Sequence, residues 1–200
     1  MAAAATVMHM RRRHEVHTCN RMVCVQREQA IETNLREMRD LKDILMKYDT
    51  NRTWRLEEDQ VRMLLRDLNQ NQEPSETELM FIMKLCDRRC NTTAIEFSEL
   101  QTAITSWKSY LRHKSEIQAL LQEFDRSGTG KLERPELKAY LVHLNGGLDV
   151  KDEEVDWVLS QADIFGDGAC STPELVMATG VWYTHVGKRK KWRSGICTIA

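Results

Sequence analysis

Twelve residues from Asp125 to Glu136, DRSGTGKLERPE, place oxygen-bearing side chains at alternating positions. Asp125, Ser127 and Thr129 occupy positions 1, 3 and 5, and Glu136 occupies position 12. A hard divalent cation takes roughly six to eight oxygen ligands, and a loop of this length can wrap around one. We therefore expect the first three residues to offer one oxygen each and Glu136 to offer both carboxylate oxygens.

The other positions of this loop also fit a cation-binding loop. Gly130, at position 6, allows the sharp backbone turn that the loop needs. Lys131 would offer its backbone carbonyl, and Glu133 would bind directly or through water. Leu132 would point into the core and pair its backbone with a neighbouring loop.

A second stretch, DIFGDGACSTPE, repeats the pattern less completely. Its expected ligands are Asp163, Asp167, the carbonyl of Ala169, Ser171 and Glu174. Phe165 stands at position 3 and carries no oxygen, so we expect this loop to bind a cation more weakly.

Two earlier stretches resemble the same loop but lack key ligands. In DTNRTWRLEEDQ, residues 49–60, Trp54 replaces the glycine and Gln60 replaces the last glutamate. In residues 87–99, either Asp87 stands at position 1 with Ser98 at position 12, or Arg88 stands at position 1 with Glu99 at position 12. We predict that neither loop binds calcium, because the first lacks a bidentate carboxylate and arginines oppose a cation in the second.

The chain repeats itself when it is shifted by about 76 residues. Asp49 then falls on Asp125 and Leu56 on Leu132, and each unit reads as helix, polar loop, helix. With these loops, residues 28 to 186 resemble the EF-hand superfamily in its four-loop, two-lobe calmodulin and troponin C arrangement. The resemblance implies an all-α fold of two EF-hand pairs (four helix-loop-helix units), joined by a long central helix or linker.

The expected organisation has four parts. They are a basic N-terminal tail (1–27), an N-terminal lobe (28–110, loops 49–60 and 87–99), a C-terminal lobe (111–187, loops 125–136 and 163–174) and a polybasic C-terminal tail (188–200). The tails carry formal charges of +4 and +5 in a chain of net charge −1, so the body carries −10. This asymmetry favours cation binding in the body and anionic partners at the ends, although solvated tails on an acidic domain would have the same composition.

Several local patterns make structural predictions. Leu56 should pair with Ile95, and Leu132 with Cys170, as short antiparallel bridges between loops. A capping box from Ser75 to Glu78 should begin a helix, and Asn145 should end one. Residues 97–124 contain no glycine or proline and should form either one long helix or a helix that frays around 109–115.

Apolar residues at helical spacing predict the core. Ile31, Leu35, Met38, Leu41 and Leu45 recur along one face of a helix before the first loop. Trp107, Trp157 and Trp182 occupy apolar helical positions and should be buried, and the methionines fit either core positions or an adaptable groove.

The C-terminal tail suggests membrane attachment. Cys197 begins the sequence CTIA, which fits a C-a-a-X prenylation signal, and Lys188–Arg193 would supply a second, electrostatic signal for an anionic membrane surface. An ordinary basic tail with an incidental cysteine is the alternative, as is docking of the tail on the acidic body.

The six cysteines show no disulfide spacing, and the chain shows no secretory signal, so we expect a reducing compartment. We expect a cytoplasmic protein, membrane-anchored on the cytoplasmic face if Cys197 is prenylated. The basic N-terminus weakly resembles a mitochondrial presequence, and a ciliary location also stays open.

The resemblance implies a calcium sensor or adaptor that binds one or two Ca²⁺ ions and grips an amphipathic helix of a protein target. We expect no enzymatic activity, because the sequence offers no nucleophile–base pair, phosphate loop or zinc spacing. We expect no nucleic-acid partner. The alternatives are a calcium buffer and a metal-independent structural subunit of a larger ciliary or membrane-associated assembly.

Overall fold

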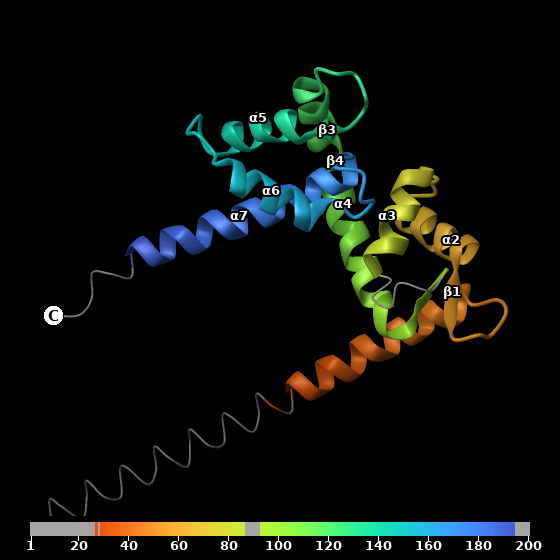
Figure 1. Ribbon diagram of the computed structural model, residues 1–200. Helices are drawn as coiled ribbons and strands as arrows, with labels where there is room; N and C mark the ends of the chain where they lie inside the picture. Colours follow the sequence, from red (N-terminus) through yellow and green to blue (C-terminus); the bar gives the residue numbers. More distant parts are fainter. Residues whose placement is uncertain (1–26, 28, 87–92, 195–200) are drawn as a thin grey trace, which may run out of the picture. The chain divides into compact units, whose positions relative to one another are not determined.

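The computed structural model describes residues 27, 29–86 and 93–194, with side chains described as far as residue 186 (Figure 1). It is mostly helical with two short two-stranded sheets, which confirms the predicted all-α class. By its backbone contacts the chain divides into two units, Met1–Lys47 and Tyr48–Ala200.

The first unit contains most of a helix over residues 29–48. The predicted helix is confirmed, but its apolar face is exposed over its first half. Ile31, Leu35 and Met38 are 61%, 54% and 50% exposed, whereas Leu45 is fully buried. Helical periodicity therefore predicted the helix correctly, but it did not predict which of the apolar residues on that helix are buried.

The second unit begins with β1 (Arg55–Glu57), α2 (Glu58–Leu68), α3 (Glu76–Cys86), β2 (Ala94–Glu96) and the first half of α4 (Phe97–Phe124). β1 and β2 pair antiparallel, and Leu56 lies opposite Ile95 as predicted. The capping box of α3 is confirmed, because the Ser75 amide donates to Glu78 Oε2 at 2.8 Å and the Glu78 amide donates to Ser75 Oγ at 3.3 Å.

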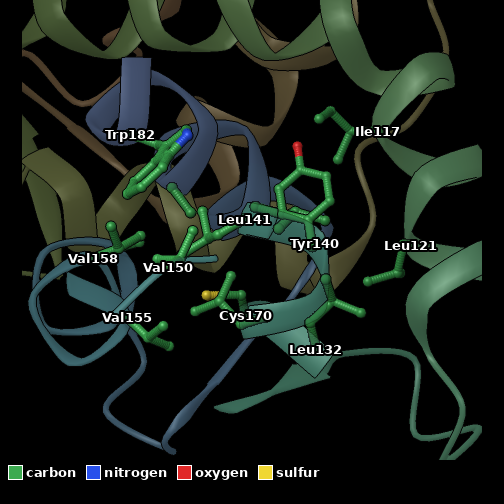
Figure 2. Close-up of a cluster of buried hydrophobic side chains, with 14 residues drawn as sticks. Ile117, Leu121, Leu132, Tyr140, Leu141, Val150, Val155, Val158, Cys170 and Trp182 are labelled. Carbon is green, nitrogen blue, oxygen red and sulfur yellow. The ribbon is translucent and has the colours of Figure 1, made fainter. Parts of the chain in front are cut away.

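The second half of α4 leads into β3 (Leu132–Glu133), α5 (Arg134–Leu144), α6 (Asp152–Ala162), β4 (Ala169–Cys170) and α7 (Thr172–Ser194). β3 and β4 pair antiparallel, which confirms the predicted register of Leu132 opposite Cys170. Both of these side chains are fully buried, in a core cluster that also contains Tyr140, Val155 and Trp182 (Figure 2). The bridge therefore places loops 125–136 and 163–174 side by side.

The long helix α4 is continuous and does not fray in its middle. Tyr110 Oη donates to Glu78 Oε1 at 2.5 Å, and Lys114 Nζ lies 2.7 Å from the same oxygen. Glu78 is buried, which would disfavour its charge, but the Lys114 ammonium group balances that charge and the Tyr110 hydroxyl donates a hydrogen bond to it. The contact fastens the middle of α4 to the start of α3.

Two of the three predicted core tryptophans are buried, and the third is not. Trp107 and Trp182 are 0% and 1% exposed, but Trp157 is 41% exposed, so its predicted burial is wrong. The buried face of α6 consists of Val155, Val158 and Ala162, spaced three and four residues apart. Trp157 follows Val155 by two residues, and this spacing rotates its side chain away from that face.

None of the described helices is long and apolar enough to cross a membrane. Cys86 and Cys170 are buried and form no disulfide, whereas the other four cysteines lie outside the residues whose side chains the structure describes.

Candidate metal centre

Three of the predicted loops share one backbone conformation. The left-handed region is occupied at positions 4 and 6 of each: Arg52 and Trp54 (φ 59° and 61°), Gly128 and Gly130 (72° and 76°), and Gly166 and Gly168 (75° and 80°). Glycine adopts this region without a steric penalty, whereas Arg52 and Trp54 are strained there by roughly 1 kcal/mol or more each. The loop over residues 49–60 therefore has the same backbone shape as the other two, although neither position 4 nor position 6 is a glycine.

The first aspartate of each loop holds that shape through amide hydrogen bonds. Asp125 Oδ1 accepts from the amides of Gly128 and Thr129 at 2.8 and 3.1 Å, and Oδ2 accepts from Gly130 at 2.7 Å. The Gly130 amide, with those of Thr129 and Gly128 and the Ser127 hydroxyl, lowers the pKa of the Asp125 carboxyl below its ordinary value. This carboxylate is charged at neutral pH, which favours its binding to a divalent cation.

The expected ligand oxygens of loop 125–136 lie in a continuous chain. Ser127 Oγ is 3.2 Å from Asp125 Oδ1 and 3.2 Å from Thr129 Oγ1. Thr129 Oγ1 is in turn 3.2 Å from the carbonyl oxygen of Lys131. Positions 1, 3, 5 and 7 are thus drawn together, and this donor set suits a hard cation.

Glu136 reaches back across the same loop from the first turn of α5. Its Oε1 accepts from the amides of Arg126 and Ser127, both at 2.9 Å, and its Oε2 accepts from the Glu133 amide at 2.9 Å. Desolvation raises the pKa of Glu136, but these amide hydrogen bonds outweigh it and lower the pKa below its ordinary value. The Glu133 side chain caps α5 in return, so position 9 belongs to a capping box.

Loop 163–174 repeats this arrangement. Asp163 Oδ1 accepts from the amides of Gly166 and Asp167 at 2.6 and 3.2 Å, and its Oδ2 accepts from Gly168 at 2.8 Å. Glu174 is fully buried and accepts from the Phe165 amide at 2.9 Å. Glu174, at position 12, therefore joins the end of this loop to its start by a hydrogen bond, as Glu136 does in loop 125–136.

The other predicted ligands of this loop are engaged locally. The Ser171 hydroxyl and amide donate to Glu174 Oε2 at 2.6 and 2.9 Å. Asp167 Oδ1 accepts from the Ala169 amide at 3.1 Å, and Oδ2 pairs with Lys131 Nζ from the neighbouring loop. Ala169 lies in β4, opposite Glu133.

Phe165 packs outside the set of predicted ligands. Its ring lies beneath Lys84 Nζ, 5.1 Å from the ring centroid, in a cation–π contact with α3. Phe165, which deprives this loop of one ligand, thus contacts α3, a helix far from it in the sequence.

Phe165→Asp is expected to raise the calcium affinity of this loop roughly tenfold, because it supplies the missing oxygen at position 3. A calorimetric calcium titration against the unaltered protein would measure the change. Phe165→Leu also removes the aromatic ring but adds no oxygen, so its affinity should stay unchanged. An equal gain in both variants would contradict this explanation.

Loop 49–60 has its own hydrogen-bond network in place of a carboxylate at position 12. Gln60 Nε2 donates to Thr50 Oγ1 at 3.0 Å and lies 3.3 Å from Asn51 Oδ1. Gln60 Oε1 accepts from the Glu57 amide at 3.0 Å, as Glu136 does from Glu133. The side-chain amide of Gln60 thus joins both sides of the loop by hydrogen bonds and without an ion. That this loop does not bind calcium stays a prediction.

The pairing of β1 with β2 fits one of the two registers predicted for loop 87–99. Ile95 lies opposite Leu56, which is position 8 of its loop, and the Glu96 amide donates to Glu99 Oε2 at 3.0 Å. These positions match a loop that starts at Arg88, which itself lies outside the described residues. In this register Glu99 stands at position 12, and an arginine stands where an aspartate would be needed.

Within the described residues, no three histidine, cysteine, aspartate or glutamate side chains form a group that could hold a metal. Three of the six expected donors of loop 125–136 are not side chains of these four residue types. Ser127 and Thr129 offer hydroxyls, and Lys131 offers a backbone carbonyl. Two contacts at the site were missed by the sequence reasoning, the pair of Lys131 with Asp167 and the contact of Lys84 with Phe165. No sequence pattern indicated either contact, since each joins residues that lie far apart in the chain.

No family model matches the chain. The chain is similar to "Probable calcium-binding protein CML11" of Oryza sativa subsp. japonica, with 30% identity over 145 residues, 71% of this chain. The match spans 66% of that relative's length. The helical fold, the bridged loop pairs with their shared backbone and this similarity agree with the resemblance to the EF-hand superfamily.

Proposed function

We propose that this protein is a calcium sensor or adaptor with four EF-hand units, of which only two bind the ion. Loop 125–136 is the stronger site and loop 163–174 the weaker one. The observation that carries the proposal is the chain of oxygens from Asp125 through Ser127 and Thr129 to the Lys131 carbonyl, closed by Glu136. Ca²⁺ bound there would supply positive charge that holds these oxygens together.

The partner we propose is an amphipathic helix of a target protein. A cavity of about 720 Å³ lies among α3, α4, α6 and α7. Its lining includes Phe81, Leu85, Trp157, Met177 and Val181, and this mixture of aromatic and flexible apolar groups suits the apolar face of a helix. The exposure of Trp157, unexpected for a core residue, supports a role in binding.

A calorimetric calcium titration in millimolar magnesium tests the proposal. One or two sites with dissociation constants of roughly 10⁻⁷ to 10⁻⁵ M are expected. Calcium should also increase the fluorescence of an apolar dye, because a sensor opens apolar surface and a buffer hardly does. Saturable binding without a dye response would indicate a buffer, and no binding at all would indicate a metal-independent scaffold.

We also propose that the C-terminal tail attaches the protein to an anionic, cytoplasmic membrane surface through prenylated Cys197 and the basic residues Lys188–Arg193. Two weak signals together make a stable anchor, whereas one lipid alone does not. Cys197→Ser should therefore move the expressed protein from the membrane fraction to the supernatant. Equal membrane fractions for both forms, with no prenyl label on the unaltered protein, would rule the anchor out.

A further inference from the structure

Lys131 belongs to one predicted calcium loop by its backbone and to the other by its side chain. Its carbonyl oxygen lies in the ligand chain of loop 125–136, next to Thr129 Oγ1. Its ammonium group crosses to loop 163–174 and pairs with Asp167 Oδ2. The pairing of Leu132 with Cys170 makes this crossing short, because it holds the two loops side by side.

The ammonium group lies among the carboxylates of the weaker loop. The hydrogen bond that Lys131 donates to Asp167 raises the pKa of Lys131 above its ordinary value, and the charges of Asp167, Glu174 and Asp163 add to this. Conversely, Lys131 lowers the pKa of Asp167. All three of these carboxylates are predicted calcium ligands, so Lys131 brings a tethered positive charge to the place where the ion would bind.

We propose that Lys131 sets the calcium affinity of loop 163–174 by competing with the ion for Asp167. The inference rests on the proposed function and adds to it a reason why the two sites would fill at different calcium concentrations. Calcium that enters this loop must displace the ammonium group from Asp167 Oδ2 or bind with one charged ligand fewer. The loss of the oxygen at position 3, where Phe165 stands, makes the loop more dependent on Asp167.

The expected size of the effect is moderate. Lys131 and Asp167 side chains are 38% and 36% exposed, so their attraction alone is screened by solvent. A divalent ion nearby would in addition be repelled by the ammonium charge. Together these effects predict that removal of the charge strengthens binding in this loop roughly three- to tenfold.

The stronger loop keeps all its ligands when this side chain is changed. Position 7 contributes only a backbone carbonyl, which every residue type provides. Lys131→Met has a similar length and no charge, whereas Lys131→Arg keeps the charge. Lys138→Met is the matched control, because Lys138 pairs with Asp152 at 3.0 Å on α5 and α6 and is not among the groups that shift Asp167.

Two backbone amides report on the loops separately. The Gly130 amide donates to Asp125 Oδ2 at 2.7 Å, and the Gly168 amide donates to Asp163 Oδ2 at 2.8 Å. A cation that binds either aspartate should shift the corresponding amide resonance. The full chain of each variant is titrated with calcium while both amides are followed by two-dimensional NMR, whose signal dispersion also shows whether the variant is folded.

In Lys131→Met, the Gly168 midpoint should fall roughly three- to tenfold, and Lys131→Arg should keep it near that of the unaltered protein. Lys138→Met should shift it clearly less than Lys131→Met does. An unchanged Gly168 midpoint in Lys131→Met, or no calcium response of Gly168 in that variant, would overturn the inference. Failure of the Gly130 resonance to respond in the unaltered protein would instead refute the proposed function at its main site.

Discussion

Glu136→Gln is expected to weaken calcium binding at the proposed site in loop 125–136 by at least roughly 100-fold, because it removes one charge and one of two carboxylate oxygens. The Glu136 carboxylate also accepts three backbone hydrogen bonds, from Arg126, Ser127 and Glu133. The nitrogen of a glutamine side chain cannot accept any of them. The substitution therefore disturbs the loop as well as the ion, and both effects lower the affinity.

The measurement is a calorimetric calcium titration of the purified variant. Glu123→Gln is the matched control, because Glu123 is exposed at the end of α4 and changes the net charge equally without touching the proposed ligands. The control should keep its affinity within roughly a factor of two. Equal affinities for Glu136→Gln and the unaltered protein would remove loop 125–136 as a calcium site.

Trp107→Ala is expected to lower the free energy of unfolding by roughly 3 to 5 kcal/mol. Trp107 is fully buried, stacks on Tyr110 with ring centroids 5.4 Å apart, and donates from Nε1 to the Leu65 carbonyl at 2.9 Å. Alanine would leave a large cavity and would remove one of the two hydrogen bonds that the Leu65 carbonyl accepts, the other coming from the Asn69 amide. Urea unfolding with a calcium chelator measures the loss.

The loss should be the same in calcium, because Trp107 contacts α2, which follows loop 49–60, and this loop is predicted not to bind the ion. Trp157→Ala serves as the control, since Trp157 is 41% exposed and its removal should cost less than half as much. Similar losses for both tryptophans would mean that Trp107 is less important to the core than its burial indicates.

The features that the sequence predicted correctly depend on short, fixed spacings. The register of Leu56 with Ile95 and of Leu132 with Cys170 follows from position 8 of paired loops, and both are observed. The capping box from Ser75 to Glu78 is equally local and is also observed. Such patterns can be predicted because the interacting groups lie on one turn of chain or in equivalent repeats.

The tertiary structure decided which faces of the helices are covered. Ile31 and Trp157 occupy apolar positions by helical spacing, yet both are exposed. Periodicity reports that a helix has an apolar side, but the packing of other elements determines how much of that side is buried.

By itself, the sequence determined the repeat, the helical class and the residues proposed to bind calcium, because each depends on residue type at a fixed spacing. Only the tertiary structure showed that Lys131 reaches Asp167, that Lys84 covers Phe165 and that Trp54 adopts a glycine-like backbone. The first two join residues far apart in the chain, so no local pattern encodes them. The third opposes local preference, and the hydrogen bonds of Asp49 to the loop amides stabilise it against that preference.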